Sequence, residues 1–246
     1  MNRILALYIF LLLCGTVSAQ QIVEWSDLQT ITDNSRRTVY YKKGRKQPLR
    51  GKYRIIRGLD EEHVKLSDGM INGDYRRYRD GVLRESGIYA KGKRNSTFTE
   101  YYQDGVTPRK ETPMQQGKID GTVKTYFRNG KIEAEKEYKQ SVESGRERRF
   151  DSKTGEQIFE SHYIDGKKDG EEWEIFEDAS TLRSRIIRHY RNGKLDGSYR
   201  VESTRDGKPY ITIEGQYTDG EKSGQWIEHN YDNNTQTCTW HGEGGA

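Results

Sequence analysis

The sequence repeats itself about every 25 residues, and this period constrains the fold more than any other feature. The copy Tyr163–Phe176 reads YIDGKKDGEEWEIF. Each copy opens on an aromatic or apolar anchor, and successive anchors are 23–27 residues apart. The eight anchors are Tyr41, Leu66, Tyr89, Met114, Tyr138, Tyr163, Tyr190 and Tyr217. Such a period indicates a repeat array, in which each unit packs mainly on its neighbours.

Two glycines recur at fixed places in the copies. An opening glycine follows the anchor by three residues, at Gly44, Gly69, Gly92, Gly117, Gly166, Gly193 and Gly220, with Ser141 in the remaining copy. A closing glycine comes next, at Gly51, Gly73, Gly121, Gly145, Gly170, Gly197 and Gly224, with Ser96 in the remaining copy. An apolar residue follows, at Tyr53, Tyr75, Phe98, Val123, Trp173, Tyr199 and Trp226. Because glycine adopts positive φ at little cost, we predict positive φ at the closing glycines.

Apolar and polar residues alternate within a copy. In Lys131–Tyr138, Ile132 and Ala134 alternate with glutamates, and Tyr210–Tyr217 shows the same pattern. A period of two predicts half-buried β-strands, and pairs such as Asn192-Gly193 predict tight hairpin turns. The sequence therefore predicts an all-β fold: an elongated single-layer stack of about eight antiparallel β-hairpin repeats of 23–27 residues.

Some aromatic residues are three positions apart within one predicted strand, as are Tyr75 and Tyr78, or Phe98 and Tyr101. Strict alternation places such a pair on opposite faces of a sheet. Two explanations remain open at this point: either both faces carry aromatic residues, or a β-bulge turns one residue of the pair toward the other face.

Composition would suggest disorder, since 31% of the residues are hydrophobic and 33% are charged. However, the chain holds 17 Tyr, six Phe and four Trp, which supply a large apolar area per side chain. A thin sheet needs less core per residue than a globule does, so we expect an elongated ordered stack.

The N-terminal residues Met1–Ala19 have the pattern of a secretory signal peptide. Arg3 precedes an apolar run, Ile4–Leu13, and small residues end the segment before Gln20. Ten apolar residues are too few for a permanent membrane span, so we expect a soluble periplasmic or secreted protein. Lipid anchoring through Cys14 is disfavoured because a large residue precedes that cysteine.

The predicted organisation has four parts. A signal peptide occupies residues 1–19, and an N-terminal cap of residues 20–40 contains an atypical hairpin around Asp33-Asn34-Ser35. The repeat array covers residues 41–230, followed by a C-terminal cap and tail at 231–246. The mature chain would keep one cysteine, Cys238, which excludes a disulfide framework within the chain and a multi-cysteine metal site. We favour a half-buried thiol in the last strand over a covalent dimer through this residue.

The repeat unit G-x-Y-x-x-Y-x-x-x-G-x-L-x-x-x-x-x-Y-x-x-G-K-x-x-G fits Gly73–Ser96, Gly121–Gly145 and Gly170–Gly197. It resembles the MORN repeat, especially its bacterial variant, and the resemblance covers roughly Tyr40–Trp240. The resemblance implies a long curved sheet of hairpins with a non-catalytic role in binding or scaffolding. Bacterial members are often catalogued as YwqK-type antitoxin components, which fits poorly with a secretion signal.

No enzyme motif is present in the sequence. The histidines His63, His162, His189, His229 and His241 lack metal-ligand spacing, and His162 and His189 recur with the period as strand residues. An acidic cluster comprises Glu171, Glu172, Glu174 and Glu177. We interpret this cluster as a solvated strand face, because no apolar or cationic neighbour would separate the pKa values of its carboxyl groups. We therefore expect no catalysis, no cofactor and no metal site.

One segment is strongly basic. Between Ser35 and Gly58 there are ten cations and no acid: Arg36, Arg37, Lys42, Lys43, Arg45, Lys46, Arg50, Lys52, Arg54 and Arg57. We favour a solvated face that protects the first strands from edge pairing. The alternative is a site for anionic lipid head groups or envelope glycans. Without the signal peptide the net charge would be +3, too small to indicate a nucleic-acid partner.

Three classes of function fit these features. The leading hypothesis is an interaction protein of the cell envelope, whose long repeat face binds a protein or glycan through exposed aromatic residues. The alternatives are a protein that binds membrane surfaces through the basic N-terminal repeats, and an antitoxin or immunity-type partner. The sequence does not predict the oligomeric state.

Overall fold

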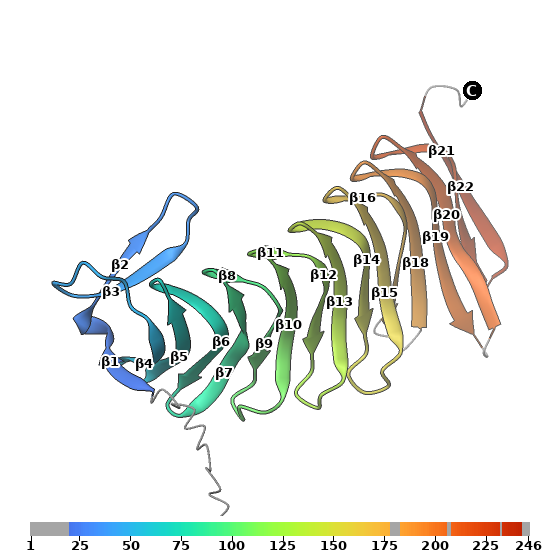
Figure 1. The fold of residues 1–246 in the computed structure, drawn as a ribbon. Coiled ribbons are helices and arrows are strands. Elements are labelled where there is room, and N and C mark those ends of the chain that lie inside the picture. Colours follow the sequence, from blue (N-terminus) through green and yellow to red (C-terminus); the bar gives the residue numbers. More distant parts are fainter. Residues whose placement is uncertain (1–19, 178–182, 206–207, 232, 243–246) are drawn as a thin grey trace, which may run out of the picture.

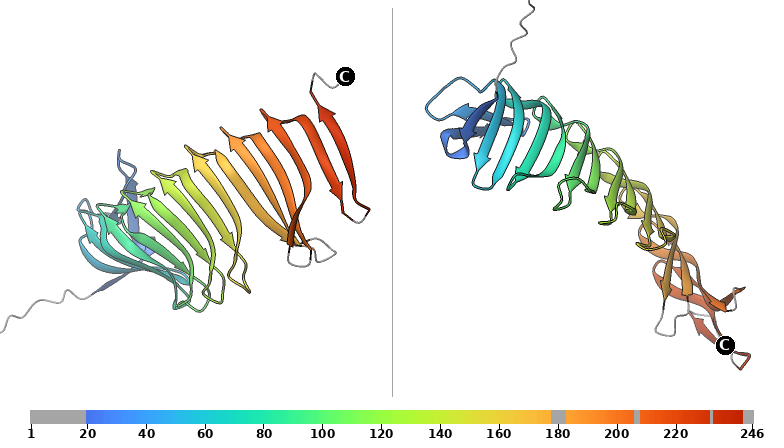
Figure 2. Two further views of the ribbon diagram at one scale, coloured as in Figure 1. Left: turned by 90° about the vertical axis from the view of Figure 1, so that its right-hand side faces the viewer. Right: turned by 90° about the horizontal axis from the view of Figure 1, so that it is seen from below.

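A computed structural model describes residues 20–177, 183–205, 208–231 and 233–242. The chain forms one long, mostly antiparallel sheet of 20 strands, built from successive hairpins and not closed, and a separate two-stranded hairpin. The hairpins stand side by side along a curved sheet, with their turns in two rows along its edges (Figure 1, Figure 2). The predicted all-β hairpin stack is confirmed. The predicted signal peptide lies outside the described residues.

The elements of the N-terminal half are β1 Gln21–Glu24, the short 3₁₀ helix η1 Trp25–Asp27, β2 Leu28–Thr32, β3 Thr38–Lys42, β4 Gly51–Arg57, β5 Asp60–Ser67, β6 Met70–Arg79, β7 Val82–Ala90, β8 Lys93–Arg94, β9 Thr97–Tyr101, β10 Pro108–Gln115, β11 Lys118–Ile119 and β12 Gly121–Tyr126. Those of the C-terminal half are β13 Ile132–Lys139, β14 Val142–Phe150, β15 Gln157–Ile164, β16 Lys167–Lys168, β17 Gly170–Glu177, β18 Arg183–Arg191, β19 Lys194–Arg205, β20 Lys208–Thr218, β21 Glu221–Asn230 and β22 Thr235–His241.

The opening glycines from Gly69 onward lie in two-residue hairpin turns, whereas Gly44 lies in the longer connection between β3 and β4. In the turn between β18 and β19, Asn192 and Gly193 have φ of 51° and 85°. Asp165 and Gly166 have 49° and 79° in the corresponding turn of the preceding repeat. Two successive positive φ angles are typical of the type I′ turn, whose twist matches that of the flanking strands.

The closing glycines from Gly73 onward lie in β-bulges a few residues further on, whereas Gly51 pairs regularly with Leu66. Between β18 and β19, Arg188 pairs with Tyr199 but Tyr190 pairs with Leu195, so three residues around Gly197 oppose one on β18. The φ angles of Gly51, Gly73, Gly121, Gly145, Gly170 and Gly197 are 102–123°, and that of Gly224 is 63°. The predicted positive φ is therefore found at every closing glycine, and a side chain there would be strained.

A ladder of backbone hydrogen bonds joins each turn to the next. The N–H of an opening glycine donates to a carbonyl near the turn of the preceding repeat; Gly193 donates to Lys168, for example, at 2.8 Å. The donors are Gly69, Gly92, Gly117, Ser141, Gly166, Gly193 and Gly220, with acceptors Leu49, Ile71, Arg94, Ile119, Glu143, Lys168 and Leu195 respectively, at 2.7–2.8 Å. We call this set the turn ladder. It fixes the spacing of successive hairpins along one edge.

The residue before a closing glycine supports the same edge. The side chain of Asp169 accepts a hydrogen bond from the N–H of Asn192, at 3.0 Å, in the next turn. Asn72 and Asn95 accept in the same way from the N–H groups of Lys91 and Gln116. The Asp or Asn residue before the closing glycine, or before Ser96 in one repeat, therefore hydrogen-bonds to the following repeat through its side chain.

Both faces of the sheet carry aromatic residues, which decides between the two explanations left open by the sequence. Tyr75 is buried, and its ring lies 5.3 Å from that of Tyr89. Tyr78 instead packs against His63, with ring centroids 4.7 Å apart, on the other side. We call the side with Tyr75 the aromatic face and the side with Tyr78 the opposite face.

The aromatic face holds two ring clusters, one near each end of the array. Tyr75, Tyr89 and Phe98 form the first, within a core that also contains Ile55 and Leu66. Tyr199, Tyr217 and Trp226 form the second, with ring centroids 5.2–5.7 Å apart. The rings of Phe98 and Trp226 lie directly over Gly87 and Gly215, where an added Cβ would approach ring atoms to 2.7 and 2.3 Å.

The N-terminal cap contains the predicted hairpin. Strands β2 and β3 pair antiparallel around the turn that begins at Asp33, and the N–H of Tyr40 donates to the carbonyl of Gly69 on the main array. The sequence did not predict that β1 pairs in parallel with β4 at this end of the sheet. At the other end, β22 pairs with β21.

We predict that Gly170→Val destabilises the protein by about 1 kcal/mol or more, because valine is strained at the φ of 102° found there. The nearest side-chain atom to an added Cβ is 3.7 Å away, so the cost comes from the backbone rather than from a clash. The urea midpoint measures the change. Glu171→Val on the same strand is the control, and an equal loss in both variants would contradict the explanation.

Gly215→Ala should be costly for the other reason, because its Cβ would overlap the indole of Trp226. We expect a loss of about 1–3 kcal/mol, typical of overpacking. In a Trp226→Leu background the same substitution should cost much less, and a double-mutant cycle by urea unfolding measures this coupling. Equal costs in the two backgrounds would show that the ring contact is not the cause.

Candidate binding surfaces

The middle of the aromatic face is ionic rather than aromatic. Two residues after a closing glycine, most repeats place an apolar side chain on this face, such as Phe98 or Tyr199. Two successive repeats place Glu147 and Glu172 there instead. Trp173, which the sequence analysis included in the apolar series, follows its glycine by three residues and pairs with Ile187 across the sheet. Its ring lies on the opposite face, 4.3 Å from the guanidinium carbon of Arg185.

Glu172 is only 1% exposed, so the interpretation of the acidic cluster as a solvated face is wrong for this residue. Lys168 forms an ion pair with its carboxylate, and Arg188 Nε lies 3.2 Å from the other oxygen. The hydroxyl of Tyr190 donates a hydrogen bond to the carboxylate of Glu172 at 3.4 Å. Cations therefore do lie beside this cluster, but they come from a two-residue strand and from the next long strand, where the local sequence did not place them.

Glu147 has matching surroundings one repeat earlier. Lys136 Nζ lies 3.0 Å from its carboxylate, and the hydroxyl of Tyr163 donates to it at 3.1 Å. Burial, together with the negative charge of Glu147, raises the pKa of Tyr163 to about 12. Burial alone would lower the pKa of Lys136, but hydrogen bonds to Glu143 and Glu147 raise it overall. Both groups thus keep their protons at neutral pH, and the network links three strands by charge-assisted hydrogen bonds.

The residue two positions before each anchor carries a signal that sequence reasoning missed. It is glycine where the ring of Phe98 or Trp226 lies directly over it, at Gly87 and Gly215. It is Lys136 where half-buried Glu147 lies beside it, and Arg188 where buried Glu172 does. Size and charge therefore match across neighbouring repeats, and comparing the two series of positions would have revealed the ionic section.

Four of the ten cations of the basic segment are engaged within the chain. Arg37 pairs with Asp33 at 2.7 Å, Arg50 pairs with Asp68, and Arg54 pairs with Glu61 at 2.7 Å. The guanidinium of Arg57 lies over the ring of Trp25, 3.6 Å from its centroid. The first three are therefore largely neutralised, and Arg57 has a packing role.

The other six cations are exposed and have no ion pair among the described residues: Arg36, Lys42, Lys43, Arg45, Lys46 and Lys52. Arg36 lies in the β2–β3 turn, and four of the others are on or just after β3. The excess positive charge is thus concentrated on the cap hairpin and the turn that follows it. This part of the predicted basic segment has the geometry that an anionic partner would need.

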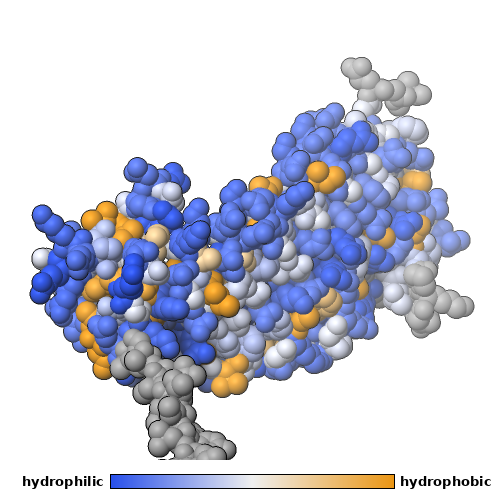
Figure 3. Space-filling view, viewed as in Figure 1, coloured by the Kyte–Doolittle hydropathy of each residue, from blue (hydrophilic) through white to orange (hydrophobic). Residues whose placement is uncertain are grey.

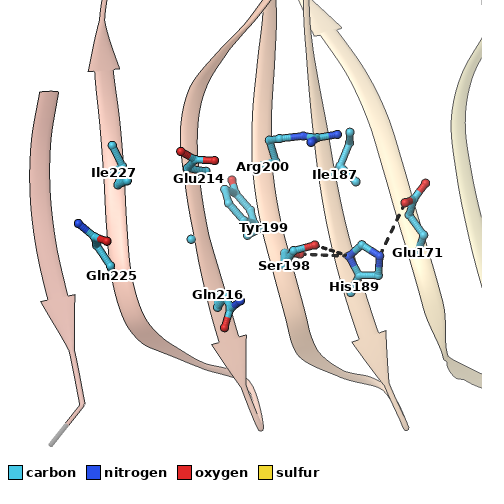
Figure 4. A pocket seen from close by; sticks show the side chains of 11 residues that line it. Glu171, Ile187, His189, Ser198, Tyr199, Arg200, Glu214, Gln216, Gln225 and Ile227 are labelled. Atoms are coloured by element: carbon cyan, nitrogen blue, oxygen red, sulfur yellow. Dashed lines mark hydrogen bonds and ion pairs between the residues drawn. The ribbon is translucent and has the colours of Figure 1, made fainter. Parts of the chain in front are cut away.

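The opposite face is hollowed near the C-terminal end. A depression of about 510 Å³ has Ile187 and Ile227 among its lining residues, together with polar side chains that include His189, Arg200 and Glu214 (Figure 4). Arg200 is bound to Glu202 at 2.8 Å, and Glu214 lies 3.4 Å from His229. The site combines aliphatic groups with both charges and amides, a lining suited to a polar surface group of a partner.

His189, Ser198 and Glu171 meet in this depression. Nδ1 of His189 lies 3.0 Å from the hydroxyl of Ser198 and 3.2 Å from the carbonyl of the same residue, and Nε2 lies 3.7 Å from Glu171. His162 makes the equivalent contact to the carbonyl of Glu171, at 3.0 Å, one repeat earlier. When Nδ1–H donates to that carbonyl, it is not a base for the hydroxyl. The recurrence supports a structural role for both histidines.

Exposed hydrophobic residues are scattered. On the side seen in Figure 3, they form small groups within a mainly hydrophilic surface. The most exposed aromatic residues in the described part of the chain are Phe176, Tyr231 and Trp240. The rings of the two clusters pack on one another, so the long row of exposed aromatic residues that the leading hypothesis requires is absent from the described residues.

Cys238 lies in the last strand, as predicted, but it is exposed and not half-buried. The physical reason is that β22 has a neighbour on one side only among the described strands. Its side chain therefore lacks the flanking residues that half-bury those of inner strands.

The fold places the chain among proteins built from repeated β-hairpins. No protein-family model matches the chain, and no curated protein matches it. Within the described residues, no helix is long and apolar enough to cross a membrane, and no group of three or more His, Cys, Asp or Glu side chains is arranged to hold a metal ion.

Glu172→Gln should destabilise the protein by about 3 kcal/mol, because it removes the buried charge that pairs with Lys168 and with Nε of Arg188. Glu174→Gln is the matched control, since Glu174 also pairs with Arg188 but is 40% exposed at its side chain. That control should cost about 0.5 kcal/mol or less. Urea unfolding at pH 7 measures both, and similar losses would refute the special role of Glu172.

Proposed function

We propose that this protein is a non-catalytic MORN-type repeat protein of the bacterial cell envelope, and that its sheet is a binding or scaffolding surface. The observation that carries the proposal is the unclosed sheet, which presents two long faces formed by successive repeats. The residue pattern of Met1–Ala19 supports export to the periplasm or the medium, with cleavage rather than lipid anchoring. The partner would be a protein or an envelope glycan, and an antitoxin or immunity-type role is an alternative.

The depression on the opposite face is the part of the array best suited to such a partner. It has half-buried Ile227 beside exposed Gln216 and Gln225, next to the buried side chain of Ile187. An apolar centre with a polar rim is the usual anatomy of a protein interface. Two further hollows of about 490 Å³ near Tyr231 are lined mainly by polar residues. We therefore assign docking to the depression that contains Ile227.

Cross-linking in intact cells followed by isolation of the envelope fraction should recover the exported chain with a partner in constant ratio. Gln216→Arg with Gln225→Arg should reduce recovery of that partner, because added charge must then be desolvated at the interface. Gln115→Arg with Gln116→Arg is a control on the turn edge, where Lys91 occupies the equivalent position in another repeat. An unprocessed cytoplasmic chain, or a chain recovered without any partner, would contradict the proposal.

A second candidate function is binding to anionic membrane surfaces. It is favoured by the six cations on and around the cap hairpin that have no ion pair among the described residues. Each cation held near an acidic membrane contributes about 1 kcal/mol, and the effect weakens as salt screens the charges. Four or more such groups acting together would give measurable binding at low salt.

Charge reversal tests this second function. Replacing Lys42, Lys43, Arg45 and Lys46 by Glu should abolish co-sedimentation with vesicles that contain phosphatidylserine at low salt. The control replaces four exposed lysines of the array by Glu, namely Lys118, Lys131, Lys139 and Lys153, and thus changes the net charge equally. Native protein that does not sediment at low salt, or equal losses in both variants, would exclude the cap as a membrane site.

A further inference from the structure

The last strand, β22, differs in charge from the rest of the sheet. Its sequence is TQTCTWH, and there is no Asp, Glu, Lys or Arg between Asn233 and Gly242. Every other strand of the 20-stranded sheet contains at least one charged residue, in a chain of which 33% is charged. Threonine, tryptophan and cysteine give β22 a high β-propensity, and no proline interrupts it.

β22 is also an edge. It pairs with β21 over seven residues, from Gly224 opposite His241 to Asn230 opposite Thr235, and with no other described strand. It stands at the C-terminal end of the array (Figure 1). Half of the backbone N–H and C=O groups of such a strand point away from the sheet, where they are open to pairing with another strand. Six of its seven residues are exposed, and Trp240 is 62% exposed.

Natural edge strands are usually protected by lysine, proline, a bulge or a covering element. The other end of the array is protected in this way, because β1 is only four residues long, carries Glu24 and is followed by the cap hairpin. The pairing of β22 with β21 has no register shift, and the strand has none of the protective residues. This contrast indicates that another strand covers the open edge of β22.

We propose that β22 pairs with β22 of a second copy of this chain, antiparallel and in the register that places Cys238 opposite Cys238. A twofold axis through this pair brings Thr237 opposite Thr239 and Gln236 opposite Trp240. The pairing is charge-neutral, it joins threonines that form favourable cross-strand pairs, and it covers Trp240. An isologous contact of this kind closes on itself and gives a dimer rather than a fibre.

The size of the contact sets the expected affinity. Seven paired residues bury less than the roughly 1,200 Å² of a standard stable interface. We therefore expect a reversible dimer with a dissociation constant in roughly the micromolar range. Dimerisation would join two arrays into one continuous sheet and double the number of docking surfaces.

A charge-swap series tests the register. Thr237→Lys with Thr239→Lys places lysine opposite lysine twice and should weaken dimerisation at least about tenfold. Thr237→Lys with Thr239→Glu places lysine opposite glutamate twice, only in the proposed register, and should restore it. Sedimentation velocity over a concentration series measures all three proteins, and circular dichroism checks that each is folded.

Cys238 supplies an independent readout on the Cys14→Ser chain, in which it is the sole thiol. Opposed residues of an antiparallel pair have Cα atoms about 4.5–5.5 Å apart, within the range of a disulfide. Two Cys238 thiols give their two hydrogens to diamide, which is reduced to the hydrazine while one S–S bond forms. We expect rapid cross-linking of the native edge, loss of cross-linking in the Lys/Lys variant and recovery in the Lys/Glu variant.

Several results would overturn the proposal. If the native chain stays monomeric, β22 does not pair with a second copy, and its edge is open to a strand of another protein. A species that grows beyond a dimer with concentration would indicate head-to-tail pairing of β22 with β1. A dimer that the Lys/Lys variant retains would place the contact elsewhere on the molecule. Failure of a folded Lys/Glu variant to dimerise would refute the register.

Discussion

The turn ladder is the interaction on which the rest of this structure depends. A single-layer sheet has no second layer to hold its hairpins in place, so the spacing between repeats must be fixed within the layer. The N–H of each opening glycine from Gly69 onward, or of Ser141 in its place, meets this need by donating to the preceding turn. Each such bond contributes only about 1 kcal/mol, but the same bond recurs from Gly69 to Gly220. The type I′ turn and the Asx residue before the closing glycine both serve this geometry.

Regular spacing lets neighbouring repeats match side chains row by row on the aromatic face. At the ends of the array the rows are rings over glycines, as with Trp226 over Gly215. In the middle they are glutamates between cations and tyrosines, as around Glu172. Ring clusters exclude water, whereas the ionic section binds strands through directional contacts that need both partners. We expect the two sections to respond differently to salt for this reason.

The interaction surfaces follow from what these internal contacts leave free. The rings of the two clusters pack on one another, so the proposed binding falls to the hollow of the opposite face, the cap hairpin and the end strand β22. These three regions have different chemistries: mixed polar and aliphatic, cationic, and neutral with unpaired backbone groups. They also lie on different parts of the array, so one molecule has room for several contacts at once.

By itself, the sequence determined the repeat, the hairpins and the positive φ of the closing glycines, because these depend on residues close together along the chain. It also placed Cys238 in the last strand and the cap hairpin at Asp33. Tertiary structure decided that Arg50 and Arg54 are paired, since Asp68 and Glu61 reach them from other turns and strands. It also decided the burial of Glu172, the face on which Trp173 lies and the exposure of Cys238. Each of these depends on which strand lies alongside, and a period along one chain does not contain that information.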